Sequence, residues 1–310
     1  MKSRILLIGK NGQLGAELAI KLPALGDVIA VDRQQLDLSK PNDIRNTIQE
    51  IRPILIVNAA AYTAVDQAEK EEAVAKAINA DAPALMAQEA KKIGAGMVHY
   101  STDYVFDGSK HSPYNEDDTP NPVSVYGKTK LAGERAIQDI GLPHLIFRTA
   151  WVYGTRGRNF LLTISRLASQ SEELRIVRDQ FGAPTWCREI ARGTASVLAS
   201  LLADQGGALS LPKTGGVYHM TAAGVATWCD FAEAILCEIS NAPPSLPWLA
   251  TATCGRAVIA KRINAITTAQ YPTPARRPAY SVLSNSRLAQ RFGIQLAEWR
   301  TQLHSAVIDS

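Results

Sequence analysis

The sequence predicts an α/β protein with a doubly wound parallel sheet of the Rossmann type, followed by a smaller α/β lobe. Two observations carry this prediction. Short β-branched runs alternate with helical stretches through the first half of the chain, and apolar runs such as Ile54-Leu55-Ile56-Val57 are continuous rather than alternating. Continuous apolar runs are typical of parallel strands that are buried on both faces.

The first half of the chain supplies the expected sheet. Strands are expected at residues 4–8, 28–32, 54–58, 97–101 and 144–148, and helices at 13–22, 41–51, 68–92 and 125–139. Pro41 suits the first turn of its helix, because proline lacks the N–H group that a first turn leaves unpaired. Repeated strand-helix units of this kind make a doubly wound fold.

The second half is less regular. Helices are expected at 159–170, 187–202 and 227–240, strands at 174–177 and 217–220, a loop-rich region from Pro243 to Pro278, and two short closing helices. The segment 187–220 looks like one more helix and strand for the sheet. We therefore expect a first domain of residues 1–150 that also includes about 187–220, and a second lobe formed by 151–186 and 221–310.

Composition argues for an ordinary globular protein. The 310 residues are 46% apolar, and 33 basic against 29 acidic side chains give a net charge of +4 without a block of five like charges. This balance does not favour a nucleic acid or a membrane as partner. The four cysteines form no CxxC motif, which fits reduced thiols. The first apolar run is too short for a secretory signal, so we expect a cytoplasmic protein.

A glycine-rich turn lies between the first expected strand and helix. Gly9, Gly12 and Gly15 have the spacing GxxGxxG, which departs from the GxGxxG fingerprint but still offers bare backbone amides at a helix N-terminus. Such amides can hold a pyrophosphate, although the three glycines alone fit a plain tight turn as well. Asp32 ends the second strand, where an acid commonly binds ribose hydroxyls. Arg33 beside it could hold a 2'-phosphate instead.

We therefore predict that the first domain binds a dinucleotide, NADH or NADPH, with the preference left open. Small residues after the third strand would let the cofactor approach the backbone, although they could also serve close helix packing. The residues expected at the cofactor are Gly9, Asn11, Gly12, Gln13, Leu14, Gly15, Asp32, Arg33, Asp37, Leu38, Ala60, Ala61, Tyr62, Thr63, Tyr126 and Lys130.

Tyr126 and Lys130 stand four residues apart on an expected helix, so both side chains lie on one face. An ammonium beside a phenol would lower the pKa of the phenol and prepare it as an acid near neutral pH. A half-buried aromatic with a lysine stretched along the helix surface would look the same in isolation. The hydroxyls of Ser101 and Thr102, upstream, could hold the other side of a substrate carbonyl.

These motifs in this order resemble the extended short-chain dehydrogenase/reductases, and within them the dTDP-4-dehydrorhamnose reductase family. The resemblance spans nearly the whole chain. Besides the three glycines, Asn58-Ala59-Ala60 and the Tyr126 and Lys130 pair, it rests on the stretches 61–69, 101–108, 148–154, 179–185 and 277–281.

The resemblance implies an NAD(P)H-dependent reduction of the C4 keto group of dTDP-4-dehydro-L-rhamnose to dTDP-L-rhamnose. Tyr126 would protonate the C4 oxygen, and Lys130 would hold the nicotinamide ribose and stabilise the tyrosinate. Thr102 would hydrogen-bond the carbonyl and tune the tyrosine. Thr102 is chosen over Ser101 because the hydroxyl of the family stands three residues before a valine, here Val105.

Further residues are expected at the dTDP-linked 4-keto-6-deoxysugar. Asp103 would add a hydrogen bond to the substrate or cap the following turn. Trp151 would lie against the deoxysugar or pack in the core. Gln180 would line the mouth of the site, and Arg276 or Arg277 would pair with phosphate oxygens or remain solvated.

The resemblance also implies a magnesium ion held by glutamates between the subunits of a homodimer. Its counterparts here would be Glu17, Glu189 and Glu298, of which the first two could equally be helix-surface carboxylates. Two other functions stay open: a nucleotide-sugar epimerase or dehydratase, and a non-catalytic subunit like the regulatory subunit of methionine adenosyltransferase. A 4,6-dehydratase should carry two acids after the hydroxyl, where Asp103-Tyr104 supplies one.

Overall fold

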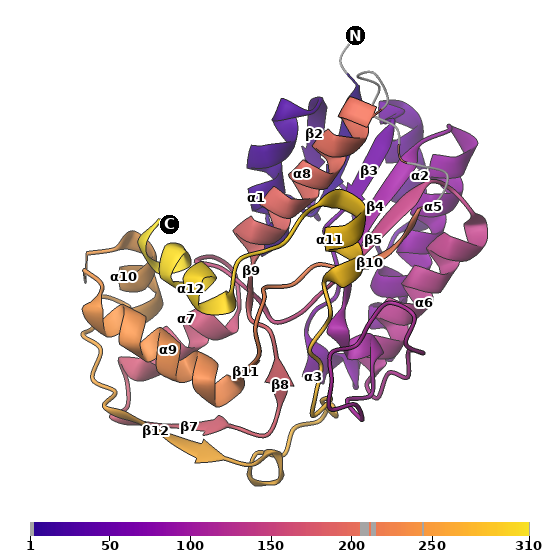
Figure 1. Cartoon of the computed structure of the whole chain (residues 1–310). Helices are drawn as coiled ribbons and strands as arrows, with labels where there is room; N and C mark the ends of the chain where they lie inside the picture. The colour runs from indigo at the N-terminus through magenta and orange to yellow at the C-terminus, as the bar shows by residue number, and fades with distance from the viewer. Residues whose placement is uncertain (1–2, 205–210, 212–214, 244, 310) are drawn as a thin grey trace.

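The computed structural model describes residues 3–204, 211, 215–243 and 245–309 (Figure 1). A six-stranded sheet with helices on both faces fills one side of the molecule, and a smaller lobe lies beside it. The strands of this sheet are all parallel; they are β1 (Arg4–Ile8), β2 (Asp27–Val31), β3 (Leu55–Asn58), β4 (Gly96–Thr102), β5 (His144–Thr149) and β10 (Gly216–His219). The predicted α/β class and parallel sheet are confirmed.

The strands follow the order β10-β5-β4-β3-β1-β2. The chain moves from β1 outward to β2 and then returns to the other side of β1 with β3, so the order reverses between β1 and β3. Open parallel sheets bind ligands outside the carboxyl ends of the strands at such a switch point. The glycine turn after β1 lies there.

Helices cover both faces of the sheet. On one face α1 (Gln13–Lys21) packs against α8 (Cys187–Asp204), and on the other lie α2 (Pro41–Ile51), α5 (Ala82–Lys92) and α6 (Val125–Ile140) (Figure 1). Ile5 and Leu7 belong to the core under the first pair, and Leu6 and Ile8 to the core under the other three. Since alternate strand residues point to opposite faces, both cores require apolar residues in succession.

The prediction of one helix over residues 68–92 is wrong. The segment begins earlier and is divided into α3 (Val65–Ala68), α4 (Glu72–Lys76), a π-helical turn η2 (Ala77–Asp81) and α5. Pro83 has no N–H to donate to the carbonyl of Asn79, so the helix widens before it. The backbone of Asn79 then lies against Gly133 of α6, where a Cβ atom would stand 2.2 Å from the Asn79 oxygen.

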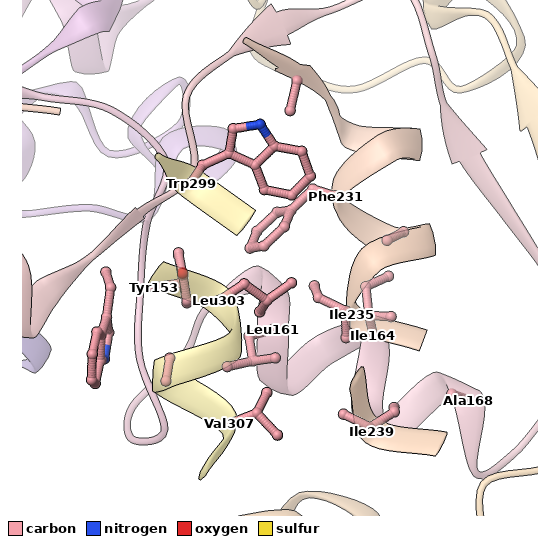
Figure 2. Packing of buried hydrophobic residues seen from close by; sticks show 14 of the residues in the cluster. Tyr153, Leu161, Ile164, Ala168, Phe231, Ile235, Ile239, Trp299, Leu303 and Val307 are labelled. Atoms are coloured by element: carbon pink, nitrogen blue, oxygen red, sulfur yellow. The ribbon is translucent and has the colours of Figure 1, made fainter. Parts of the chain in front are cut away.

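The smaller lobe has its own hydrophobic core. Its helices are α7 (Phe160–Ala168), α9 (Trp228–Asn241), α10 (Pro247–Thr253) and α12 (Trp299–Ile308). Figure 2 shows side chains of α7, α9 and α12 meeting around Phe231. The Phe231 ring lies 5.1 Å from that of Tyr153 and edge-on to Trp299 at 6.1 Å, which is the usual range for aromatic pairs.

The expected loop region from Pro243 to Pro278 contains an α-helix and a β-strand that the sequence prediction missed. One is α10, and the other is β12 (Arg262–Ile266), which pairs in parallel with β7 (Glu173–Val177). Most of the β12 side chains are exposed, so no apolar run marks this strand. Two short pairs were also missed, β6 (Val152–Tyr153) with β9 (Thr185–Trp186), and β8 (Phe181–Gly182) with β11 (Ala226–Thr227). A last helix, α11 (Ser286–Phe292), precedes α12.

A buried ion pair joins α6 to the sheet. Arg148 of β5 donates from Nε and Nη2 to the carboxylate of Glu134 at 2.7–3.2 Å, and both residues are almost fully buried. Losing one partner of such a pair leaves an uncompensated charge in the interior. The pair therefore fixes the helix that carries Tyr126 and Lys130.

We expect Arg148→Met to destabilise the protein by about 3–5 kcal/mol, because Glu134 would remain buried without its cation. Urea unfolding measures this change. The double variant Arg148→Met, Glu134→Leu removes both charges and should recover most of the loss. Equal stability of the single and double variants would show that the lost stability does not come from the orphaned charge.

Candidate active site

A cleft of about 1230 Å³ opens at the carboxyl ends of the parallel strands. This volume exceeds the usual range for one drug-sized ligand, so the cleft has room for more than one molecule. Most of the residues predicted for cofactor and substrate line it: Gly9, Asn11, Gly12, Gln13, Leu14, Asp32, Arg33, Asp37, Leu38, Ala60, Ala61, Tyr62, Thr63, Thr102, Asp103, Tyr126, Lys130 and Trp151.

The glycine turn has the shape of a phosphate cradle. Gly9 has φ of +92°, a conformation that favours glycine. A Cβ atom on Gly15 would stand 2.0 Å from the carbonyl oxygen of Gly9, so only glycine lets α1 begin this close to the turn. The first turn of α1 has no side-chain cap, since Gly12 occupies the N-cap position. Its free N–H groups fit the pyrophosphate of a dinucleotide.

We expect Gly15→Ala to weaken dinucleotide binding by at least tenfold, because the new methyl group has to push the turn away from α1. Equilibrium titration of NADPH fluorescence measures the change. The control is Ala16→Gly, which changes α1 without introducing a clash. Gly141→Ala would not serve, because Gly141 has positive φ. Unchanged affinity in Gly15→Ala would contradict the assignment of the turn.

Asp32 is held at the rim of the cleft. Burial opposes its ionisation, but hydrogen bonds from the backbone N–H groups of Gln35 and Gln34 outweigh that effect and lower its pKa. Asn11 also donates to the carboxylate at 3.1 Å, and the Lys10 ammonium lies 3.5 Å away. A fixed carboxylate at this strand end suits ribose hydroxyls.

Close packing of α6 places Tyr126 at the cleft. Ser124 caps the helix by accepting from the N–H of Gly127, whose missing side chain leaves room for the Tyr104 carbonyl; a Cβ there would stand 2.2 Å away. The ring of Tyr126 then meets that of Tyr104 edge-on, with centroids 5.6 Å apart. The helix thus brings Tyr126 beside the residues that follow β4.

The sequence prediction that Lys130 lowers the pKa of Tyr126 is wrong for the cofactor-free protein. Burial raises the pKa of Tyr126 to about 12, against a lowering effect of a hydrogen bond with Thr102. Lys130 is itself buried, and burial lowers its pKa to about 8. Its ammonium nitrogen donates to the Tyr100 carbonyl at 2.6 Å. The helix spacing puts both groups on one face, but the lysine turns toward the strand.

Thr102 and Asp103, at the end of β4, line the same cleft as Tyr126. The Thr102 hydroxyl donates to Asp103 at 3.0 Å and accepts from the N–H of Tyr104 at 3.2 Å. The hydroxyl of Ser101 is buried and has no hydrogen-bond partner among the described residues. Burial raises the pKa of Asp103 to about 6, and its second carboxylate oxygen is buried without a partner in the described part of the chain. That oxygen can accept from a ligand hydroxyl.

Trp151 stands at the lobe side of the cleft in a strained backbone conformation, with φ of +46°. Its indole stacks on that of Trp228 from α9, with centroids 3.5 Å apart. Gly182 lies so close that a Cβ there would stand 2.4 Å from the indole. The prediction that Gln180 lines the cleft is wrong. Its side-chain amide instead accepts a hydrogen bond from Trp228 and donates one to Thr268.

The two arginines predicted to bind phosphate, Arg276 and Arg277, lie in different surroundings. Arg277 forms a two-point pair with Asp66 of α3, at 3.1 and 2.7 Å, and also donates to Thr273. This pair ties the C-terminal segment to the sheet domain and occupies the guanidinium. Arg276 is exposed, and neither arginine lines the cleft.

The three glutamates considered for magnesium each have a partner of their own. Glu17 accepts from Arg188 at 3.1 Å, Glu189 pairs with Arg192, and Glu298 caps the first turn of α12. Within residues 3–204, 211, 215–243 and 245–309, no three Asp, Glu, His or Cys side chains are grouped to hold a metal. The described part of one chain therefore holds no such group of three ligands, and we assign no catalytic step to magnesium.

The sequence prediction missed several residues that line the cleft. Tyr104, Trp228, Arg158 and Ile78 reach the cleft from four separate segments. Tyr104 directly follows the predicted Thr102 and Asp103, so an expected turn there was a usable signal. Trp228 had none, because only the packing of the lobe brings α9 to Trp151.

A dinucleotide cradle at the switch point of a parallel sheet, with a tyrosine, a lysine and a hydroxyl in the same cleft, defines an NAD(P)H-dependent oxidoreductase of the extended short-chain dehydrogenase/reductase class. The family described as RmlD substrate binding domain matches residues 2–310. No helix in the part of the chain that the structure describes has the length and apolar character needed to cross a bilayer.

Comparison with known proteins narrows this class. The chain is 47% identical over 306 residues to a dTDP-4-dehydrorhamnose reductase of Burkholderia thailandensis, covering 99% of this chain and 98% of that protein. A crystal structure of dTDP-4-dehydrorhamnose reductase from Bacillus anthracis in complex with NADP matches both chains over their full length, with a TM-score of 0.86 and 32% identity. A UDP-glucose 4-epimerase of Thermus thermophilus, at 17% identity, covers 98% and 97% with a TM-score of 0.76 and shares the fold.

The chain belongs to the dTDP-4-dehydrorhamnose reductase family. The family resemblance read from the motifs is confirmed.

Proposed function

We propose that the protein reduces the C4 keto group of dTDP-4-dehydro-L-rhamnose to dTDP-L-rhamnose with NADPH or NADH, as a step of nucleotide-sugar synthesis for polysaccharide. The observation that carries this proposal is the shared cleft, which Thr102 and Tyr126 line together with the glycine cradle. The NADP complex of the Bacillus anthracis relative supports the choice of cofactor.

The cofactor supplies the hydride for C4 of the sugar when it is bound. The residues of the chain handle the proton and the developing negative charge on oxygen. With substrate bound, the Thr102 hydroxyl would turn its hydrogen from Asp103 to the carbonyl, which polarises it, and Tyr126 would give its phenol proton to the same oxygen. Its high pKa keeps this proton in place before the reaction. Lys130, from the same helix face, stabilises the tyrosinate that remains.

The other proposed substrate contacts follow from position in the cleft. The unpartnered oxygen of Asp103 would accept from a sugar hydroxyl, and Trp151 with Trp228 would offer an apolar edge to the deoxysugar. Three expectations stay predictions. The first is the division into a domain of residues 1–150 with about 187–220 and a lobe of 151–186 and 221–310. The others are a cytoplasmic location and a homodimer with magnesium held by Glu17, Glu189 and Glu298. The dimer and the metal would both require groups from a second subunit.

Following NADH and NADPH oxidation against dTDP-, UDP- and GDP-linked 4-keto-6-deoxysugars tests the proposal. We expect the dTDP-linked sugar to give the highest kcat/KM, and purified protein to release its dinucleotide on dialysis. An epimerase or dehydratase would retain the dinucleotide and turn over without net oxidation of NAD(P)H. A non-catalytic subunit would oxidise neither cofactor with any of the sugars.

A further inference from the structure

A buried polar chain lies behind Lys130. His99 of β4 stands directly opposite Asn58 of β3 in the sheet, and its Nδ1 is 3.2 Å from Asn58 Nδ2. The other ring nitrogen, Nε2, is 3.4 Å from Lys130 Nζ. All three side chains are at most 2% exposed. Water is therefore kept from these groups, and their hydrogens have to match their partners within the protein.

The orientation of the Asn58 amide is fixed by the backbone. The N–H of Ala60 donates to Asn58 Oδ1 at 3.1 Å. Turning the amide over would set its NH₂ group against that N–H, which places two donors face to face. Asn58 Nδ2 therefore faces His99, and because an amide nitrogen only donates, His99 Nδ1 has to accept.

This arrangement determines the tautomer of His99. Burial is the main cause that holds the pKa of His99 well below its usual value, so the ring is neutral and carries one N–H. With Nδ1 accepting, that hydrogen sits on Nε2 and points at Lys130 Nζ. An ammonium group has only donors, whereas a neutral amine has a lone pair. When Lys130 is neutral, each hydrogen along this buried chain points at an acceptor. Asn58 donates to His99, His99 donates to the Lys130 lone pair, and Lys130 donates to the Tyr100 carbonyl.

We propose that Asn58 and His99 act as a positioning pair that favours the neutral amine of Lys130 in the cofactor-free site, and that dinucleotide binding brings a proton from solvent onto Lys130. The inference rests on the proposed function only for the identity of the ligand. Bound ribose hydroxyls and phosphates would offer Lys130 acceptors that the free site lacks. Above about pH 8, where the free site holds mostly the neutral amine, cofactor binding would then restore the ammonium beside Tyr126.

The charges around Lys130 are consistent with this role. Burial lowers the pKa of Lys130 to about 8, and Glu134, one turn along α6, raises it in opposition. Glu134 is already paired with Arg148 of β5. His99 faces Lys130 from β4 with an N–H rather than a charge. The ionisable residues Tyr100, Asp103, Tyr104 and Tyr126 line the same cleft as Lys130. The neutral Lys130 therefore gains population above about pH 8.

The tautomer is tested directly in cofactor-free protein by ¹⁵N NMR of histidine-labelled samples, with His99→Gln used to assign the signal. We expect His99 to be neutral, with its hydrogen on Nε2, throughout pH 6–9. A hydrogen on Nδ1, or a protonated ring at pH 7, would overturn the proposal. This result does not depend on any activity of the enzyme, and so it separates the proposal from the proposed function.

Proton uptake is tested by calorimetric titration with NADPH in two buffers of different ionisation enthalpy. At pH 8.5 we expect wild-type protein to take up roughly three quarters of a proton, as a pKa near 8 requires, and little at pH 6. His99→Gln can turn an oxygen toward the ammonium, so its uptake at pH 8.5 should fall to less than half. Lys130→Met should abolish it, and the exposed His111→Gln should match wild type.

Equal uptake in His99→Gln and wild-type protein would show that His99 does not set the protonation of Lys130. Uptake that persists in Lys130→Met would place the proton elsewhere. Either result overturns the proposal. Failure of NADPH to bind at all would count against the proposed function, and the NMR tautomer would then decide this proposal alone.

Discussion

Replacing Tyr126 by Phe is expected to lower kcat by about 10²–10⁴-fold with a saturating keto sugar, because the proton donor is lost while the ring remains. The edge-on contact with Tyr104 is kept, so the fold and dinucleotide affinity should be unchanged. Steady-state turnover and an NADPH titration of the same sample separate the two effects.

Tyr114→Phe is the matched control for loss of a phenol. The Tyr114 hydroxyl donates to Asp107, and Tyr114 does not line the cleft. Turnover of this variant should stay close to wild type, with a modest loss of stability. Wild-type turnover in Tyr126→Phe would remove the acid role from Tyr126.

Replacing Lys130 by Met is expected to change activity and stability in opposite directions. Turnover should fall by about 10²–10⁴-fold, since the tyrosinate loses its stabilising cation. Stability at pH 7 should rise by roughly 1–3 kcal/mol, because the folded protein no longer buries an ammonium whose pKa is about 8 instead of 10.5. Urea unfolding measures the gain.

The pH dependence of this gain has a definite sign. The folded protein binds the Lys130 proton more weakly than the unfolded chain does, so the charge destabilises wild type fully below about pH 8. The penalty disappears as pH rises from about 8 to 10.5, and the advantage of Lys130→Met should shrink over the same range. Lys128→Met, an exposed change on the same helix, should show neither effect. A Lys130→Met protein less stable than wild type at pH 7 would contradict the account.

Much of the sheet was predictable because its physics is local. Parallel strands buried on both faces need continuous apolar runs, and β1 and β3 show them plainly. The failures arose where a single residue or a distant partner decides the structure. Pro83 turns part of a helical pattern into the π-helical turn η2, and β12 exists because β7 supplies its hydrogen bonds.

In the site, too, the features set by local sequence were predictable and those set by tertiary contacts were not. Helix spacing places Tyr126 and Lys130 on one face, and the glycines mark the cradle without knowledge of the fold. Spacing does not reveal burial, which raises the pKa of Tyr126, so the direction of this pKa shift was predicted with the wrong sign. Trp228 and His99 gain their roles from tertiary contacts with Trp151 and Lys130, and no local pattern around them signals this.

The central claim is that hydride passes from NAD(P)H to C4 of a dTDP-linked keto sugar while Tyr126 supplies the proton. Single turnovers with NADPH carrying deuterium on one or the other face of its nicotinamide C4 test this most directly. We expect one of the two labels to place a single deuterium at C4 of dTDP-L-rhamnose, as seen by NMR, with the hydroxyl hydrogen coming from solvent. Product without deuterium from either label, or with deuterium at another carbon, would contradict the claim.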